Sequence, residues 1–489
     1  MTTKRIKIIG GGLAGPEAAL QAAKRGCEVD LYEMRPTRST EAHQTSDFAE
    51  LVCSNSLKSE SESTAPWLLK QEMRRAGSIL LAEADATAVP AGHALAVDRV
   101  EFSKRVAARI AAEPLITVHR EEVTSLDESS PNTLTILASG PLTSPALAAE
   151  LQRLTGSDHL AFYDSISPIV DATTIDMDKV YFAARYDKGS ADYINCPFTK
   201  EEYERFIEAL TAAEAVPAKE WEQIPTASQN SVILSAAGQS YRPAESKDPE
   251  GASSTQASPT FSTKNPQVLQ YFEGCLPIEE TARRGRDTLR FGPMKPVGLT
   301  DPKTGRWPYA AVQLRQENLR ADSYNLVGFQ NHLKYGEQNR VLKLIPGLEN
   351  ATFLRYGQIH RNTYIHAPSL LTETLQLKAH PQIMIAGQLS GVEGYTESIA
   401  SGMLAGIYAA SIANGNTPPT APRASANGSL THYITHAETK KFTPANITFD
   451  LLPSLEEDLR KKIRDKKERH KLQCDRALAA WNDWLSATI

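Results

Sequence analysis

The N-terminal stretch RIKIIGGGLAG, residues 5–15, decides the fold of this chain. Residues 5–9 are predicted to form a buried strand, because isoleucine fills three of the five positions. The glycine-rich turn leads into an alanine-rich helix that ends at Gly26. A second strand is predicted over residues 27–32, with Glu33 directly after it. Strand, glycine turn, helix and strand together make a complete βαβ unit, which favours an α/β fold.

The turn has the spacing G-x-G-x-x-G, and an acidic residue follows 23 positions after the first glycine. Gly10 permits the tight turn, Gly12 lets a pyrophosphate approach the N–H groups of the helix start, and Gly15 lets the helix lie close to the strand. Glu33 is expected to accept hydrogen bonds from a ribose diol. Enzymes that use S-adenosylmethionine also combine a glycine turn with a distal acid, but the pyrophosphate-binding pattern fits better. The predicted dinucleotide contacts are Gly10, Gly11, Gly12, Leu13, Ala14, Gly15 and Glu33.

A second glycine cluster occupies residues 387–395 and precedes a helix of small residues predicted over 398–410. Taken alone, it is a plain strand-turn-helix connection. Together with the first motif it indicates a second helix N-terminus facing the same long ligand, as a flavin dinucleotide requires. The sequence has no second G-x-G-x-x-G, which argues against a separate nicotinamide-binding domain. The candidate contacts here are Gly387, Gln388, Gly394 and Tyr395.

The composition is that of an ordinary globular protein. The chain has 489 residues, of which 41% are hydrophobic and 23% charged. These values exclude a small disulfide scaffold and argue against global disorder. Because 53 Lys and Arg oppose 58 Asp and Glu, the net charge of -5 cannot attract a polyanion by the overall field. A nucleic-acid partner would therefore require a local basic patch.

The five cysteines lie far apart in the sequence and form no C-x-x-C pair, so we expect neither dithiol chemistry nor a metal site. A sparse, odd cysteine count suits a reducing cytosol. The N-terminus lacks the apolar segment of a signal peptide, and no apolar run approaches the roughly 18 residues of a membrane-spanning helix. We therefore expect a cytoplasmic protein without membrane contact.

Two segments depart from the alternation of helix and strand patterns. Residues 225–266 hold 18 Ser, Thr or Pro among 42 positions and show no periodicity, which predicts a low-complexity insertion. Residues 460–471 hold eight Lys or Arg against two Asp or Glu in one helical pattern near the C-terminus. Such a run is either a solvated helix face or a surface that binds phosphates.

Several further motifs, together with the basic tail, identify a family. They are DFAELVCSNS at 47–56, FEGCLP at 272–277, FGPMKPVG at 291–298, HRNTY at 360–364 and HYIT at 432–435. This set closely resembles the folate- and FAD-dependent tRNA (uracil-5-)-methyltransferases. The resemblance covers nearly the whole chain. The main departure from the family pattern is the 225–266 segment, which lies just before Cys275.

The resemblance implies a fold and a set of ligands. The fold is a Rossmann-like, glutathione-reductase-like FAD-binding α/β domain, residues 1–171 and 319–489, interrupted by a smaller α+β insertion domain at 172–318. FAD is the implied cofactor, methylenetetrahydrofolate the one-carbon donor, and NADH or NADPH the electron source. The implied product is 5-methyluridine in the T loop of tRNA. The macromolecular partner is thus tRNA, and no protein partner is expected to be required.

Two cysteines are the candidate catalytic residues that the resemblance implies. Uracil C5 is a poor nucleophile, but addition of a thiolate at C6 gives an enolate that attacks an electrophilic carbon. In the family, reduced FAD carries the one-carbon unit and supplies hydride. Cys275 is predicted to attack C6. Cys53 is predicted to be the second active-site cysteine, which acts as general acid/base or protects a flavin adduct, and the assignment of the two cysteines can be reversed. Without the resemblance, each cysteine is more simply an inert buried residue.

Weaker candidates complete the predicted site. His360 and Asn362 are candidate folate contacts, the imidazole stacking on the pterin and the amide fixing its edge, although a lone histidine is more often structural. Basic residues that exchange counterions for RNA phosphates are the candidate tRNA contacts. They are Arg283, Arg284, Arg286, Lys461 and Lys462. The three arginines also follow Cys275 closely enough to favour its thiolate if they fold toward it.

Three alternative functions are compatible with the same residues. A paralogue that methylates a ribosomal RNA uridine would have the same site, and comparing the two RNAs as substrates separates them. A non-catalytic RNA-binding flavoprotein would retain the glycine motifs but would not depend on Cys53 or Cys275. A simple nicotinamide oxidase, the least favoured alternative, would need neither RNA nor folate.

Overall fold

The computed structural model describes most of the chain. The described residues are 5–40, 42–126, 133–156, 160–187, 190–216, 276–438 and 442–488. The predicted insertion at 225–266 and the candidate Cys275 lie outside the described residues.

The first domain is built on a parallel sheet with the strand order β16-β7-β1-β2-β6. The central strand β1 (Arg5–Ile9) has the bounds predicted from the sequence, and Ile6 and Ile8 are fully buried. It pairs in parallel with β2 and β7, so that Ile8 lies beside Leu31 on one side and Ile136 on the other. The other strands are β2 (Glu28–Tyr32), β6 (Ile116–His119), β7 (Thr133–Leu137) and β16 (Ile383–Ile385).

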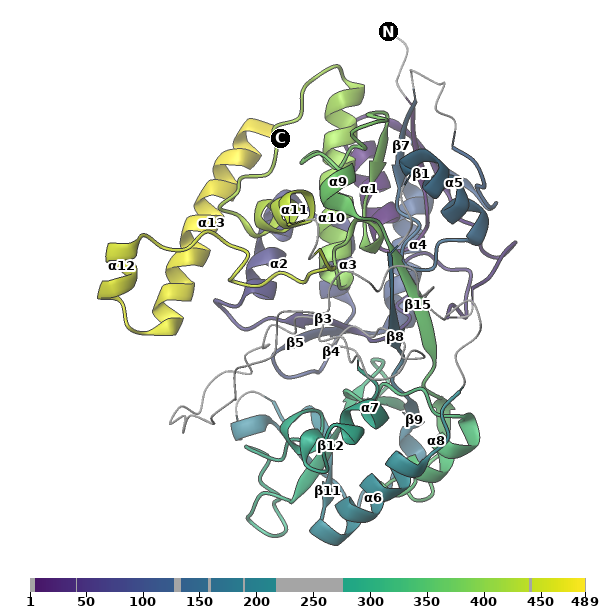
Figure 1. Ribbon diagram of the computed structural model, residues 1–489, viewed down its shortest axis with the longest axis vertical. Coiled ribbons are helices and arrows are strands. Elements are labelled where there is room, and N and C mark those ends of the chain that lie inside the picture. Colours follow the sequence, from purple (N-terminus) through teal and green to yellow (C-terminus); the bar gives the residue numbers. More distant parts are fainter. Residues whose placement is uncertain are drawn as a thin grey trace, which may run out of the picture.

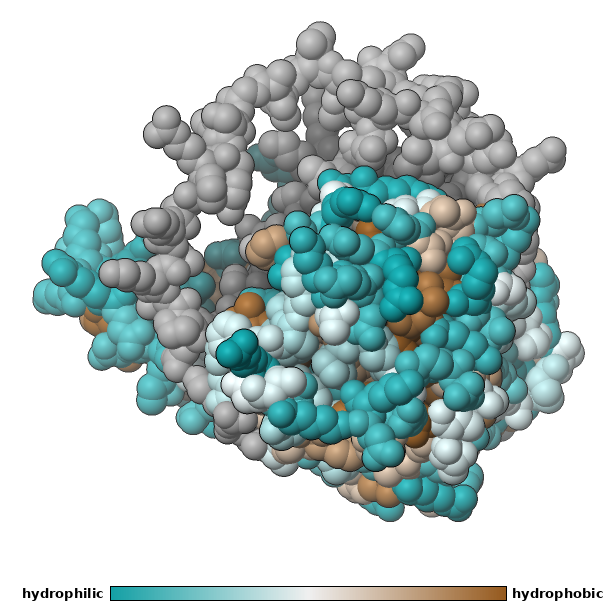
Figure 2. Space-filling model, turned by 90° about the horizontal axis from the view of Figure 1, so that it is seen from below, coloured by the Kyte–Doolittle hydropathy of each residue, from teal (hydrophilic) through white to brown (hydrophobic). Residues whose placement is uncertain are grey.

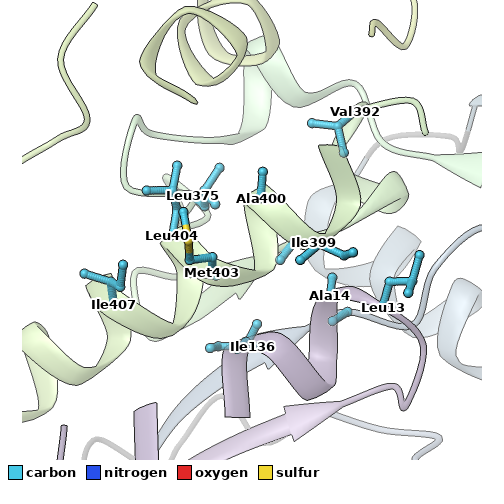
Figure 3. Close-up of a cluster of buried hydrophobic side chains, with 14 of the residues drawn as sticks. Leu13, Ala14, Ile136, Leu375, Val392, Ile399, Ala400, Met403, Leu404 and Ile407 are labelled. Carbon is cyan, nitrogen blue, oxygen red and sulfur yellow. The ribbon is translucent and has the colours of Figure 1, made fainter. Parts of the chain in front are cut away.

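Two helices of small residues pack closely beside this sheet, α1 (Ala14–Ala23) and α10 (Tyr395–Ala413) (Figures 1 and 3). A Cβ atom on Gly402 would lie 2.3 Å from the Ala14 carbonyl oxygen, and one on Gly406 would lie 2.5 Å from that of Ala18. Only glycine at these two positions allows such a close approach of the helix backbones. This packing fixes the N-termini of both helices at the same edge of the sheet.

Six further helices of the first domain surround this core, and a small antiparallel sheet of order β3-β5-β4 lies beneath it (Figure 1). The helices are α2 (Ala65–Ala76), α3 (Ile79–Ala86), α4 (Arg99–Ala112), α5 (Pro145–Thr155), α9 (Ala367–Leu370) and α11 (Ala426–His436). The small sheet consists of β3 (Ser56–Ser59), β4 (Ala88–Val89) and β5 (Ala94–Val97).

The second domain has its own hydrophobic core around an antiparallel sheet of order β10-β11-β12-β13-β9-β14. Its strands are β9 (Ile169–Asp171), β10 (Tyr181–Ala183), β11 (Tyr193–Phe198), β12 (Ala310–Gln316), β13 (Ser323–Leu326) and β14 (Phe353–Arg355). Its helices are α6 (Lys200–Ala212), α7 (Ile278–Arg283) and α8 (Tyr335–Leu342). The core draws on residues from Val170 to Ala351, whereas the predicted insertion spans 172–318. The exact domain boundaries stay a prediction.

An antiparallel ribbon of two strands joins the domains. β8 (Leu160–Ser165) enters the second domain, and β15 (Ile359–Tyr364) returns from it (Figure 1). Because the two strands pair along their full length, the second domain is held by a double connection beside the first. The α/β domain interrupted by an α+β domain confirms the predicted fold class.

The basic C-terminal run is not one helix as its pattern suggested. It divides into α12 (Glu457–Lys462) and α13 (Lys466–Thr488). The break has a local cause, because the Asp465 carboxylate accepts a hydrogen bond of 2.9 Å from the Lys467 N–H and begins a new helix. α13 then packs on α2, where the Trp481 indole donates to the Glu72 carbonyl oxygen at 2.7 Å.

One face of the molecule is mostly hydrophilic. Figure 2 shows this face from below, with small hydrophobic spots among hydrophilic residues. Among the residues that the structure describes, no helix is both long and apolar enough to span a membrane.

Candidate active site

A cleft opens at the carboxyl ends of the five parallel strands. Its walls come from the turns after β1, β2, β6, β7 and β16 and from the start of α10. In open parallel sheets, ligands bind outside this edge. Of the predicted dinucleotide contacts, these line the cleft: Gly10, Gly11, Gly12, Leu13, Ala14, Glu33, Gly387, Gln388, Gly394 and Tyr395.

The first glycine turn has the geometry that each glycine was expected to provide. Gly10 adopts a φ of +117°, and a Cβ atom there would lie 2.3 Å from the Ala138 carbonyl oxygen. Gly15 does not line the cleft; its Cβ would lie 1.8 Å from the Gly10 carbonyl oxygen, so it serves helix packing. Around Gly12, by contrast, a Cβ would meet no protein atom within 4 Å. This open space at the start of α1 fits a pyrophosphate.

Glu33 ends β2 at the side of this turn and is 5% exposed. Its carboxylate accepts hydrogen bonds from the Gly11 N–H at 2.8 Å and from the N–H and Nε of Arg35 at 2.9 Å each. Burial alone would raise the pKa of Glu33, but the Arg35 side chain and the two backbone donors outweigh it and leave the pKa below its usual value. Glu33 is therefore an ionised acceptor, as a contact to ribose hydroxyl groups requires.

The second glycine cluster forms the opposite wall of the cleft. Gly394 has a φ of +109° directly before α10, and a Cβ there would lie 2.6 Å from the Lys58 Nζ atom. Lys58 donates to the fully buried Glu397 carboxylate at 2.7 Å. Lys58 thus brings a cation to the cleft wall at the start of α10.

Cys53 lies half-buried in the wall of the same cleft. Its N–H donates to the Tyr395 hydroxyl oxygen at 2.7 Å, and the N–H of Ser54 donates to the same oxygen at 3.3 Å. Burial and the neighbouring Cys53 raise the pKa of Tyr395 well above its usual value, against the influence of Arg99. The phenol therefore stays neutral and fixes the backbone on which the thiol is carried.

Two half-buried arginines bring positive charge to Cys53. Burial alone would lower the pKa of Arg99, but Glu317, Tyr395 and Cys53 outweigh it and raise the pKa. Burial and the neighbouring Arg99 lower the pKa of Arg355, whereas Cys53 opposes this shift. Cations near a cysteine favour its thiolate, which is the reactive form.

The other cysteines of the described residues lie in apolar cores. Cys27, Cys196 and Cys474 are at most 2% exposed. Burial raises the pKa of each, to about 12 for Cys474. Cys53 is therefore the one described cysteine that reaches a cleft, whereas the position of Cys275 is not described.

A buried polar cluster holds the Cys53 segment between the two domains. The Asn55 side chain donates to the Val97 carbonyl oxygen of the first domain at 3.1 Å and to that of Gln316 at 2.9 Å. It accepts from Arg315 Nε at 3.0 Å, and Arg315 also donates to the Ser54 hydroxyl at 2.8 Å. Residues of both domains therefore position this wall of the cleft.

The predicted folate contacts lie on the ribbon between the domains. Asn362 on β15 is 1% exposed and lines the cleft. Its Oδ1 atom has no hydrogen-bond partner within the part of the chain that the structure describes. A buried amide oxygen without a partner is costly, and a ligand with a donor would satisfy it. The backbone of His360 pairs with that of Asp164 on β8.

The predicted RNA contacts form two separate groups. Arg283 and Arg286 are exposed on the second domain and pair with Glu280 and Glu208, and Arg284 is exposed beside them. Lys461 and Lys462 are exposed on α12, which extends from the first domain (Figure 1). The structure thus places these groups on the surface but does not bring them together.

Sequence reasoning missed several residues of this site, namely Lys58, Arg99, Arg315, Glu317 and Gln330, which also lines the cleft. Each is an isolated polar residue with no local pattern. Tyr395 was expected as a cofactor contact, but its hydrogen bond to the Cys53 backbone was not. Asn55 and Ser54 lie in the motif around Cys53, and that motif is the one signal that pointed to them.

Comparison with known proteins gives the family. The family model for glucose inhibited division protein A matches residues 5–247 and 251–417. A methylenetetrahydrofolate--tRNA-(uracil-5-)-methyltransferase TrmFO of Koribacter versatilis is 62% identical over 99% of this chain and 98% of its own length. The TrmFO of Enterococcus faecalis is 50% identical over 97% of each chain.

Solved structures agree on the fold. Aquifex aeolicus GidA in its form I crystal has a TM-score of 0.63 and 16% identity over 98% of this chain and 76% of its own. The form II crystal gives a TM-score of 0.62 at 15% identity, covering 99% of this chain and 74% of its own. With two full-length relatives above 49% identity, the chain belongs to the TrmFO family of methylenetetrahydrofolate--tRNA-(uracil-5-)-methyltransferases, within the wider group matched by the glucose inhibited division protein A model.

Proposed function

We infer that this protein methylates C5 of uridine 54 in the T loop of tRNA, with methylenetetrahydrofolate as the one-carbon donor. The observation that carries this inference is the full-length identity of 62% with an enzyme of that name. The flavin cleft with Cys53 in its wall supports it independently. The structure offers nothing that favours ribosomal RNA over tRNA, and the relatives are named for tRNA.

The residues that line the cleft fit FAD. NADH or NADPH is the proposed source of the electrons that reduce it. The N–H groups at the start of α1 would hold the pyrophosphate, Glu33 the ribose, and the Gly394 turn the far end of the ligand. The chemistry that a bound flavin supplies is two-electron and one-carbon transfer. The residues that line the cleft bind and orient the ligands. Among them, Asn362 offers a hydrogen-bond acceptor to the folate.

In our proposal the cysteines activate the uracil ring and remove the C5 proton. A thiolate adds to uracil C6, the C5 enolate takes up the one-carbon unit, and a base then removes the C5 proton so that the bond between sulfur and C6 can break. We propose that Cys275 is the nucleophile and that Cys53, which interacts electrostatically with Arg99 and Arg355, is the acid/base. Arg283, Arg284, Arg286, Lys461 and Lys462 are proposed to contact tRNA phosphates, and the enzyme is proposed to work in the cytoplasm.

The deciding experiment follows a carbon label. Purified protein is incubated with unmodified tRNA, NADPH and methylenetetrahydrofolate labelled in the methylene carbon, and the tRNA nucleosides are analysed. We expect label in 5-methyluridine, and none when ribosomal RNA replaces tRNA. Cys53→Ala and Cys275→Ala are expected to abolish labelling while FAD stays bound, and Cys474→Ala is the control. Methylation that needs only S-adenosylmethionine would refute the proposal.

A further inference from the structure

A second cluster of ligand-type side chains lies outside the flavin cleft. Helix α11 carries His432 and His436 one turn apart, with their rings stacked at a centroid distance of 4.3 Å. Glu373, in the turn after α9, faces both rings. One ligand atom from each of these three residues lies within 4.8 Å of the other two. The side chains are 39% to 49% exposed, so a solute can reach them.

The distances suit a shared ion better than a direct hydrogen bond. Glu373 Oε1 lies 3.6 Å from His432 Nδ1 and 3.8 Å from His436 Nδ1. Hydrogen bonds of this kind are about 2.7–3.2 Å long. Ligands placed about 2.1 Å from a tetrahedral zinc ion lie about 3.4 Å from one another. The two distances from the Glu373 carboxylate exceed this value by only a few tenths of an ångström, so each carboxylate–imidazole pair lies near the spacing that one shared ion requires. The two stacked rings would have to turn before both nitrogen lone pairs point at that ion.

The electrostatic surroundings are mixed but compatible with a cation. Within the described ranges, Arg423 and Lys378 are positive groups near the cluster, and the Lys378 Nζ donates to the Pro368 carbonyl oxygen at 2.8 Å. The His436 Nδ1 also lies 2.9 Å from the Thr435 hydroxyl, a contact that an ion at this nitrogen would replace.

We propose that His432, His436 and Glu373 form a binding site for a divalent transition metal such as Zn²⁺, with water completing the coordination. Two imidazoles and one carboxylate select such ions over Mg²⁺ and Ca²⁺, which prefer oxygen ligands. The ion would tie α11 to the turn that carries Glu373, where residues Leu371 and Leu377 form a β-bridge. Among the residues that the structure describes, the hollow beside the cluster shares no lining residue with the cleft at the edge of the parallel sheet. The site is thus independent of the proposed function.

The test is a titration of untagged, full-length, metal-free protein with Zn²⁺. We expect one site per chain whose affinity falls at least tenfold in His436→Ala and in Glu373→Gln. His93→Ala removes an exposed histidine outside the cluster and is the matched control, for which unchanged affinity is expected. Zn²⁺ should raise the melting temperature of the wild type and the control but not that of the two variants.

Equal affinity in wild type, His436→Ala and Glu373→Gln would overturn the proposal. Because the three side chains are partly exposed, the variants should retain the metal-free melting temperature and bound flavin of the wild type. If a variant does not fold, titration of the wild type with Co²⁺ decides the matter. A visible band of a four- or five-coordinate nitrogen-ligated ion that Zn²⁺ displaces supports the site, and its absence refutes it.

Discussion

Alanine substitutions at Gly12 and Gly15 should change different properties of the protein. The substitution at Gly12, which faces the ligand, should weaken FAD binding, whereas the one at Gly15, which faces the protein, should lower stability. At Gly12 a Cβ atom would meet no protein atom within 4 Å, and the backbone is not left-handed there. Gly12→Ala should therefore leave the stability of the FAD-free protein unchanged. The added methyl group would occupy the space of the pyrophosphate. Losing one hydrogen bond to a charged group costs about 1.5–3 kcal/mol, which corresponds to about 10- to 150-fold weaker FAD binding.

At Gly15 the new methyl carbon would lie 1.8 Å from the Gly10 carbonyl oxygen, where ordinary contacts begin at 3.4 Å. Overlap with a backbone atom forces α1 away from β1, and overpacking of this kind costs about 1–3 kcal/mol or more. Gly15→Ala should therefore lower the melting temperature of the FAD-free protein. The assay is a pair of measurements on each variant, namely thermal unfolding without FAD and equilibrium FAD binding by fluorescence.

The result that would refute this reasoning is specific. If Gly12→Ala binds FAD as tightly as the wild type, the pyrophosphate does not lie at this turn. If Gly12→Ala destabilises the FAD-free protein as much as Gly15→Ala does, the packing around the turn has been misjudged.

Three other substitutions test the walls of the site. Tyr395→Phe removes the oxygen that accepts from Cys53 and Ser54, and should lower the free energy of unfolding by about 1–3 kcal/mol in urea titrations; an unchanged value would count against this hydrogen-bonded anchor. Asn362→Leu removes a buried oxygen that has no partner among the described residues. The substitution should therefore raise the KM for the folate at least tenfold without lowering the melting temperature. An unchanged KM would exclude the folate contact. Glu279 is 1% exposed, and burial raises its pKa to about 7 from the usual 4.5. Its folded state therefore binds the proton more tightly, so stability should fall as pH rises from about 4.5 to 7; Glu279→Gln should flatten this part of a stability curve against pH, and an equal slope in both proteins would contradict the assignment.

The parts of the molecule that local sequence patterns encode were predictable. The βαβ start follows from period and spacing, and β1 has the predicted bounds. Gly12 and Glu33 line the cleft, and their contacts to a ligand stay a prediction. The family motifs pointed to Cys53. The similarity to full-length TrmFO relatives confirms the predicted family.

The contacts that hold the site together were not predictable, because they join residues far apart in the chain. Arg99 pairs with Glu317 at 2.6 Å, and Lys58 pairs with Glu397 at 2.7 Å. No local sequence pattern predicts either of these two ion pairs. The same reason applies to the proposed metal site, where an H-x-x-x-H spacing gains its meaning only from Glu373, brought close by folding.

The central claim is that FAD lies along this cleft with its ring at the end that carries Cys53. The most direct test is a crystal structure of the protein with FAD. We expect the phosphates at the N–H groups of residues 11–14, the ribose at Glu33, and the ring in contact with Cys53. Phosphates bound elsewhere, or a ring that does not contact Cys53, would contradict the account.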